Sequence, residues 1–252
     1  MKPISLSILM LLLLVACSKN DDASHSDDSS EAILYPKTLE VLTSDTSGEL
    51  TTMLKYKYGF NANKKIASIE VEGYFGYENL YFTYGPNGKP KQIEVQNSVT
   101  TKTFEFYYLD NILAGFSTGV QDYDIQYNSS TNTYVYVDNG FTNSLTLNDS
   151  NDLRRYISTS TNNANTILEM TFDTTKKGIF FNVDVPLNLY TSIVSDVPTM
   201  LFASHIPLLE ISQSNGDVVN YQNTYDADGF VKESSIILGQ EPATLRFEYQ
   251  EL

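Results

Sequence analysis

The chain has 252 residues, of which 31 are acidic and 16 are basic, so its formal net charge at pH 7 is −15. A field of that sign repels the phosphate backbone of DNA and RNA, and no nucleic-acid partner is expected. The chain contains one cysteine, which excludes an internal disulfide and a cysteine-based metal cluster. Its length suits one large domain, because all-β domains often reach this size undivided.

The first sixteen residues have the form of a bacterial secretory signal. Lys2 gives the positive start, and residues 4–16 are apolar apart from two serines. A transmembrane helix is the alternative, but residues 4–16 would span only about 20 Å, against a hydrocarbon core of about 30 Å. The segment ends in Leu-Val-Ala-Cys, which resembles a lipobox, the motif cut just before a cysteine that then carries lipid. Residues 1–16 are therefore predicted to be a lipoprotein signal peptide, and Cys17 to be the lipidated residue that holds the protein on a membrane.

A polar, acidic stretch follows the cysteine. Residues 18–31 contain no apolar side chain larger than alanine, so burial there cannot offset the entropy lost on ordering. Residues 17–37 are predicted to be the lipidated cysteine and a flexible tether. The run Ser18–Asp22 resembles the acidic export signal of surface lipoproteins in Bacteroidetes-type bacteria. We expect an outer-membrane lipoprotein exposed at the cell surface, with a periplasm-facing lipoprotein as the alternative.

Residues 38–252 repeat one unit, which consists of a strand, a turn rich in Asn, Asp and Gly, and a return strand. The last apolar residues before the turns, here called anchors, are Tyr58, Tyr84, Tyr108, Tyr127, Leu147, Phe172, Tyr225 and Tyr249. Successive anchors are 26, 24, 19, 20, 25, 53 and 24 residues apart. The residue two positions before the anchor is apolar in seven of the eight units. Because residues two apart on a strand share a face, anchors and partners are predicted to line one buried face.

This pattern predicts an all-β fold, a large curled antiparallel β-meander built from repeated hairpins, with one insertion that contains a short helix. The insertion falls in the long gap between anchors and is placed at about residues 186–217. A strand is expected over Ile179–Val185, where Pro186 would stop it, because proline cannot donate to the ladder. A helix is expected over Thr199–Ser204, since an aspartate and a proline just before it are typical of a helix start.

Three features carry a family resemblance: the Tyr-x-x-x-Gly turns at Tyr84 and Tyr225, the run Phe172–Lys177, and the apolar insertion before Tyr225. Through them the chain is similar to Bacteroidetes lipoproteins with a DUF4595-like domain, whose hairpins resemble YD repeats. The resemblance covers about residues 38–252. It implies a large antiparallel sheet and a cell-envelope location, and it brings no established reaction and no catalytic residues.

Few residues could carry catalysis. His25 lies in the predicted tether, which leaves His205 as the histidine of the folded part, in a mostly apolar stretch that favours a packing role. One histidine with scattered carboxylates does not predict a zinc site. The stretch from Asp226 to Gly229 resembles the first half of a calcium loop, but Ile237 stands where a bidentate glutamate would be needed, so a hairpin turn is expected. No metal and no cofactor is predicted.

Two classes of function stay open. The first is a surface-anchored lipoprotein with a non-catalytic binding or structural role toward a glycan, a peptide or an envelope protein. The second is a hydrolase of an extracellular polymer, whose paired carboxylates no motif would mark. The first is favoured, because the predicted folded part contains no thiol, a single histidine and no phosphate-loop motif. Ligand contact is predicted at the insertion, with Tyr190 and His205 as the contact residues.

Overall fold

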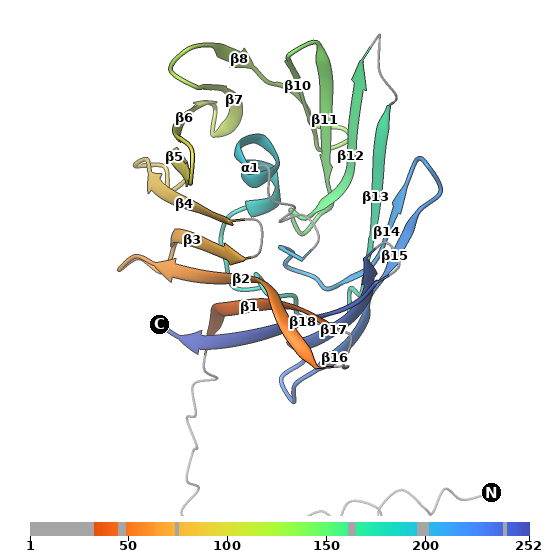
Figure 1. Ribbon diagram of the computed structural model, residues 1–252. Helices are drawn as coiled ribbons and strands as arrows, with labels where there is room; N and C mark the ends of the chain where they lie inside the picture. Colours follow the sequence, from red (N-terminus) through yellow and green to blue (C-terminus); the bar gives the residue numbers. More distant parts are fainter. Residues whose placement is uncertain (1–32, 45–48, 74–75, 161–164, 196–201, 239–240) are drawn as a thin grey trace, which may run out of the picture. The chain divides into compact units, whose positions relative to one another are not determined.

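The computed structural model describes residues 33–44, 49–73, 76–160, 165–195, 202–238 and 241–252 (Figure 1). The predicted signal peptide, Cys17 and most of the predicted tether lie outside these ranges. The folded domain begins earlier than the sequence indicated, because strand β1 spans Leu34–Ser44 and includes the last residues assigned to the tether.

Two antiparallel sheets make up the domain, and they confirm the all-β meander of hairpins with one short helix. The first sheet has eleven strands in the order β16 (Gln222–Tyr225), β17 (Val231–Leu238), β18 (Glu241–Glu251), β1, β2 (Leu50–Phe60), β3 (Ile66–Gly73), β4 (Gly76–Tyr84), β5 (Pro90–Asn97), β6 (Thr101–Leu109), β7 (Ile112–Ser117) and β8 (Asp122–Asp124). The second has seven in the order β15 (Val218–Asn220), β14 (Leu208–Gln213), β13 (Thr166–Phe172), β12 (Leu153–Ser160), β11 (Phe141–Leu147), β10 (Thr133–Asp138) and β9 (Gln126–Asn128). The last strand, β18, pairs with the first, β1, so the two ends of the domain lie side by side.

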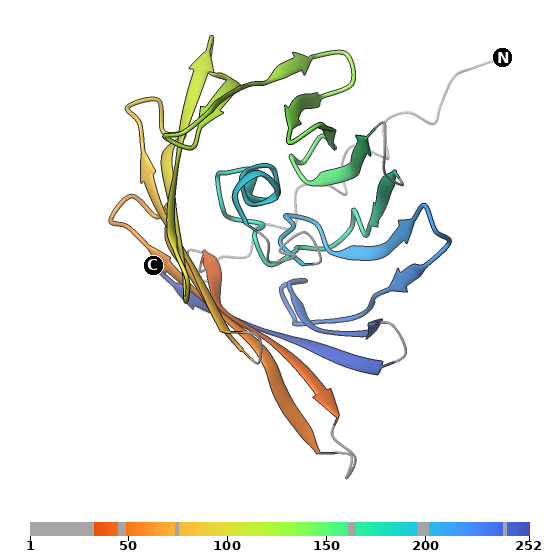
Figure 2. The ribbon, with the colours of Figure 1, turned by 45° about the horizontal axis from the view of Figure 1, so that its top comes forward.

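The chain passes between the two sheets at two single-residue bends. Ile125 separates β8 from β9, and Tyr221 separates β15 from β16. Both side chains are buried, and each backbone N–H is satisfied, by Ala114 and Leu209 respectively. At these bends one continuous run of chain leaves one sheet and enters the other, so the sheets face each other across a shared interior (Figure 2).

The predicted alternation of faces is confirmed in the core. The apolar partners two residues before the anchors are 0–7% exposed, namely Tyr56, Phe82, Phe106, Ile125, Leu145, Met170 and Phe247. Residues of opposite parity face outward, as Tyr107 and Val137 show with exposures of 46% and 58%. Each sheet therefore buries one face, and the interior is filled by period-two positions together with the segment between β13 and β14.

Register shifts in the ladders mark the end of most repeats. The ladder shifts directly before five anchors, Tyr84, Tyr108, Leu147, Phe172 and Tyr225. In the first hairpin the shift falls between Gly59 and Phe60, so Phe60 and not Tyr58 is the structural counterpart of Tyr84. The residue pattern alone does not separate the two, because Tyr58 and Phe60 are both aromatic and share one face of the strand. With Phe60 as anchor, the first two repeats are both 24 residues long.

Three anchor tyrosines share a further contact. Each side-chain hydroxyl donates to the carbonyl at the start of the preceding return strand, 18 residues earlier. The pairs and their O–O distances are Tyr84 to Ile66 at 2.8 Å, Tyr108 to Pro90 at 2.5 Å and Tyr249 to Val231 at 2.6 Å. Burial raises the pKa of Tyr108 to about 12, so its hydroxyl stays protonated and able to donate. These bonds tie each hairpin to the one before it.

The insertion differs from its prediction in three ways. Residues 179–182 form turns, so the strand over Ile179–Val185 is wrong, and helix α1 (Leu187–Val194) begins directly after Pro186. The predicted helix lies partly outside the described residues, and residues 202–204 are not helical. The insertion also ends sooner than residue 217, because β14 pairs with β13. Proline fits the start of a helix, where its missing N–H costs no hydrogen bond. Helix α1 was not predicted because six of its eight residues are buried, so apolar and polar residues do not divide into two faces.

The two arms of the insertion pair with each other inside the sheets. Gly178 N–H donates to the carbonyl of His205, and Phe180 N–H donates to that of Ser204. A Cβ on Gly178 would stand 2.4 Å from the Ser204 oxygen, so only glycine permits this approach. Helix α1 follows, and both views place it between the sheets (Figures 1 and 2).

Candidate functional site

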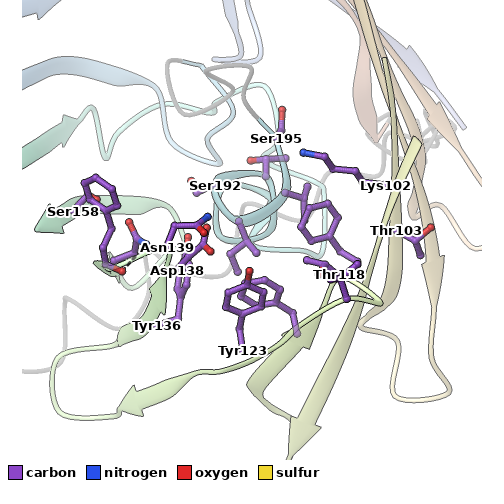
Figure 3. A pocket seen from close by; sticks show the side chains of 18 of the residues that line it. Lys102, Thr103, Thr118, Tyr123, Tyr136, Asp138, Asn139, Ser158, Ser192 and Ser195 are labelled. Carbon is purple, nitrogen blue, oxygen red and sulfur yellow. Dashed lines mark hydrogen bonds between the residues drawn. The ribbon is translucent and has the colours of Figure 1, made fainter. Parts of the chain in front are cut away.

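A pocket between the two sheets, here called the Tyr123 pocket, has a volume of about 1150 Å³ (Figure 3). It is bounded by residues of β6, β7, β8, β10, β11 and β12 and by the C-terminal end of α1. Its position follows from the bend at Ile125, where β8 and β9 separate into different sheets. The repeats that meet there are the short ones, with anchors 19 and 20 residues apart.

Aromatic rings form one wall of this pocket. Tyr123 stacks on Phe116 with ring centroids 4.5 Å apart and an interplanar angle of 12°. Tyr136 meets Phe116 edge-on at 5.5 Å and 84°. Phe116 is buried while Tyr123 is half-buried, so a fixed ring supports one that borders the pocket. Such stacked and edge-to-face pairs hold aromatic side chains in defined orientations.

Polar groups lie around the aromatic wall. Tyr156 donates to Asn143 Oδ1 at 3.0 Å. Burial, followed by the hydrogen bond and charge of Asp138, raises the pKa of Tyr123. Two buried oxygens in the lining, Asp138 Oδ1 and Ser192 Oγ, have no hydrogen-bond partner among the described residues. Unpartnered buried polar atoms are uncommon and costly, and others among the described residues, such as Asn188 Oδ1, lie outside this lining.

A second pocket, here called the Tyr190 pocket, has a volume of about 470 Å³ and lies at the N-terminal end of α1. The structure brings both predicted contact residues, Tyr190 and His205, to its lining. Tyr190 is only 2% exposed, and its ring meets Phe106 edge-on at 5.2 Å. The hydroxyls of Tyr190 and Tyr108 lie 3.0 Å apart. Because the Tyr108 hydroxyl already donates to the Pro90 carbonyl, Tyr190 is the donor of this pair. The Tyr190 hydroxyl is therefore engaged in a hydrogen bond within the protein.

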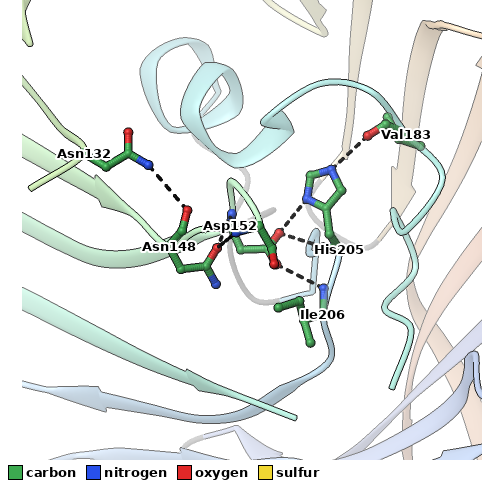
Figure 4. A network of polar contacts seen from close by, with 7 residues as sticks. Asn132, Asn148, Asp152, Val183, His205 and Ile206 are labelled. Atoms are coloured by element: carbon green, nitrogen blue, oxygen red, sulfur yellow. Dashed lines mark hydrogen bonds and ion pairs between the residues drawn. The ribbon is translucent and has the colours of Figure 1, made fainter. Parts of the chain in front are cut away.

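His205 and Asp152 form a buried polar clamp between the insertion and the β11–β12 turn (Figure 4). Asp152 Oδ1 lies 2.6 Å from the backbone N of His205 and 2.8 Å from its ring Nδ1, and Oδ2 accepts from Ile206 N–H at 3.0 Å. The ring Nε2 lies 2.8 Å from the carbonyl of Val183. Asp152 is held in turn by Asn148, whose Oδ1 accepts its N–H at 2.9 Å.

The charge state of His205 follows from these partners. Burial lowers the pKa of His205, but the hydrogen bond and charge of Asp152, with the Val183 carbonyl, outweigh burial and raise it above the ordinary value of 6.5. The imidazolium form lets both ring nitrogens donate, one to the carboxylate and one to the carbonyl. Both nitrogens are thus used within the protein, so the geometry gives His205 a packing role, and ligand contact by Tyr190 and His205 stays a prediction.

The other candidate sites are resolved more simply. Asp226 Oδ1 accepts the N–H groups of Asp228 and Phe230, and Gly229 has a φ of 82°, so the stretch that resembles a calcium loop is a hairpin turn. Across the described ranges, no three His, Cys, Asp or Glu side chains gather closely enough to hold a metal ion. In those same ranges no helix is long and apolar enough to span a membrane.

No protein-family model and no curated protein matches the sequence. Among solved structures, a porin-like protein from Bacteroides uniformis is similar with a TM-score of 0.47 and 12% identity. The match covers 85% of this chain and 96% of that chain. That likeness is too weak to support a shared function.

The residues of the Tyr123 pocket were missed by sequence reasoning. Tyr123 and Tyr136 read as ordinary strand residues, and Asp138 as one of 31 acidic residues. The signal that could have found them is the shortening of the two repeats around Tyr127. The strands of a shortened hairpin cannot pair along the whole length of their neighbours.

Proposed function

We propose that the protein is a lipid-anchored cell-envelope module, exposed at the outer-membrane surface, that binds a ligand without catalysis in the Tyr123 pocket. The observation that carries this proposal is the pocket itself, with a supported aromatic wall and two buried oxygens that have no hydrogen-bond partner among the described residues. Concave sites with an aromatic lining and a few placed polar groups are typical of ligand binding. The alternative of a periplasm-facing lipoprotein uses the same pocket.

The proposed location is supported by the sequence ahead of the domain. The apolar run that ends at Cys17 and the acidic tether behind it suit a lipidated, displayed protein. The resemblance to lipoproteins with a DUF4595-like domain supports the same location. The repeated turns add to that resemblance, because the positive φ values of Gly88 and Gly229 fall at equivalent turn positions.

Binding is favoured over hydrolysis by the charges in the pocket. Glycosidases of the usual kind need two carboxyl groups that flank the bond to be cut. Of the described residues that line the Tyr123 pocket, one, Asp138, is a carboxylate. The Tyr190 pocket also holds one, Asp184. The paired carboxylates of the alternative hydrolase hypothesis therefore have no counterpart in either lining.

The test combines location and binding in one protein. Cys17→Ala should leave an uncleaved precursor or release the chain from the membrane fraction, because both cleavage and lipidation depend on that cysteine. The soluble chain is then titrated by calorimetry with neutral oligosaccharides, acidic oligosaccharides and a mixture of decapeptides, and the same samples are analysed for products. We expect binding of at least one class with no product. Mass and fractionation that are both unchanged by Cys17→Ala, binding of none of the three classes, or steady release of products would contradict the proposal.

A further inference from the structure

We propose that the Tyr123 pocket takes an uncharged saccharide, with a sugar ring stacked on Tyr123 and Asp138 as the residue that determines specificity. This inference rests on the proposed binding function and names the class of ligand. It is supported by the geometry of the Tyr123 ring, by the two oxygens that have no partner among the described residues, and by the balance of charge in the pocket lining.

The first step concerns the ring of Tyr123. One of its faces is covered by Phe116, at 4.5 Å and nearly parallel, which fixes the plane of the ring. Figure 3 shows Tyr123 and Tyr136 projecting into the pocket. An aromatic face carries partial negative charge, and the C–H groups on one side of a pyranose ring carry partial positive charge. A supported, half-buried tyrosine thus offers a flat platform for a sugar ring.

The second step concerns hydrogen bonding. Asp138 Oδ1 and Ser192 Oγ have no partner among the described residues, although both are buried. An unpartnered buried acceptor is a cost to the fold, and a ligand donor that reaches it removes that cost. Sugar hydroxyl groups donate and accept, so one hydroxyl can donate to Asp138 while a neighbour pairs with the Ser192 hydroxyl. Asn143, already oriented by Tyr156, adds an amide to the same lining.

The third step separates a saccharide from a peptide. Extended peptides are commonly held by main-chain hydrogen bonds along one strand edge. The Tyr123 pocket instead presents side chains, drawn from six strands and the end of α1. Side-chain hydroxyls, an amide and one carboxylate around an aromatic ring suit a ligand whose polar groups point in many directions, as those of a sugar do.

The fourth step concerns charge and size. Of the described lining residues, Lys102 and Asp138 carry charge and have opposite signs, so the pocket has no net preference for an ion. The chain as a whole carries −15, which repels acidic polymers. The volume of about 1150 Å³ exceeds the roughly 300–1,000 Å³ of ordinary small-molecule sites, which leaves room for more than one ring.

The experiment uses calorimetry on the full-length Cys17→Ala chain with neutral xylo-, manno- and cello-oligosaccharides, oligogalacturonate and mixed decapeptides. At least one neutral oligosaccharide should bind. Tyr123→Leu should weaken that binding by about tenfold or more, while Tyr123→Phe, which keeps the ring, should largely preserve it. Asp138→Asn should weaken it by about tenfold. The matched controls Tyr107→Leu and Asp124→Asn, at exposed positions outside the lining, should leave it unchanged.

The outcomes separate this inference from the function on which it rests. Binding of decapeptides alone, weakened by Tyr123→Leu, would overturn the saccharide and keep the binding function. Tighter binding of oligogalacturonate than of any neutral sugar would overturn the uncharged ligand. Neutral sugar that binds equally well to the Tyr123→Leu and Asp138→Asn chains would place the site elsewhere. If Tyr123→Leu proves unfolded, Asp138→Asn carries the test alone.

Discussion

Near the two ends of helix α1, the aspartates Asp152 and Asp138 differ in how far the protein satisfies their oxygens, although Asn188 Oδ1 at the N-terminal end also has no partner among the described residues. At the N-terminal end, near the Tyr190 pocket, Asp152 accepts from three groups of His205 and Ile206, and the Tyr190 hydroxyl is engaged by Tyr108. At the C-terminal end, near the Tyr123 pocket, Asp138 Oδ1 and Ser192 Oγ find no partner among the described residues. Satisfied networks hold a fold together, whereas unsatisfied ones need something further. The comparison assigns stability to Asp152 at the first end and, under the proposed function, recognition to Asp138 at the second.

The largest effect should come from removing the clamp. Asp152 is 1% exposed at its side chain, and Asp152→Ala would leave the His205 imidazolium and two backbone N–H groups without their acceptor. Breaking a buried pair from one side costs about 3–5 kcal/mol, and we expect that loss in the free energy of unfolding measured with urea. Asp124→Ala, at an exposed position, should change it by less than about 0.5 kcal/mol.

The clamp also gives a signature in pH. The pKa of His205 is raised in the folded protein, so the stability from its charged form is fully present below the unfolded value of 6.5. It is lost as the pH rises through the folded-state pKa. The difference in free energy of unfolding between the unmodified chain and His205→Asn should therefore shrink as the pH rises above about 6.5. A loss below about 1 kcal/mol for Asp152→Ala, or a difference that grows with pH, would make the two ends of α1 equivalent.

A smaller effect is expected from the tyrosine bonds between hairpins. Tyr84→Phe keeps the ring, and with it the contact of Lys65 Nζ, 5.2 Å from the ring centroid, but leaves the Ile66 carbonyl without its donor. The free energy of unfolding should fall by about 1 kcal/mol, the net worth of one such bond. Tyr107→Phe removes an exposed hydroxyl from a neighbouring strand and should change it by less than about 0.5 kcal/mol. If the two substitutions had equal effects, the hydroxyl groups of the anchor tyrosines would not stabilise the fold through these bonds.

The fold was predictable where the sequence repeats a physical rule. Period-two burial and turns rich in Asn and Gly identify strands and hairpins, and Tyr56 and Leu145, both 0% exposed, follow that rule. The division into two sheets was not predictable, since it depends on bends at Ile125 and Tyr221, which resemble any other apolar strand residue. Helix α1 was missed because residues buried on most sides lack the one-sided pattern that marks a surface helix.

The candidate site was less predictable than the fold. Tyr190 and His205 stood out by type, yet in the structure their polar atoms are engaged within the protein. Asp138 is marked by a buried Oδ1 without a partner among the described residues and Tyr123 by a ring supported by Phe116, and no pattern of residue types along one strand shows this combination. It arises where β8 and β10 from different sheets come together, which depends on the closure of the whole domain.

The smallest effect should come from the carboxylate of the Tyr123 pocket, and it gives the sharpest contrast with Asp152. Asp138→Asn removes the charge of a carboxylate whose Oδ1 has no hydrogen-bond partner among the described residues. The amide oxygen of the asparagine can still lie beside Tyr123. The free energy of unfolding should stay within about 0.5 kcal/mol of the original, or rise slightly, because a buried unpaired acceptor is a cost to the fold. Urea unfolding of the Asp138→Asn and Asp152→Asn chains side by side measures the contrast. A loss above about 2 kcal/mol for Asp138→Asn, beyond what a surface change produces, would show that this carboxylate also serves the fold, and the division of roles between the two ends of α1 would not hold.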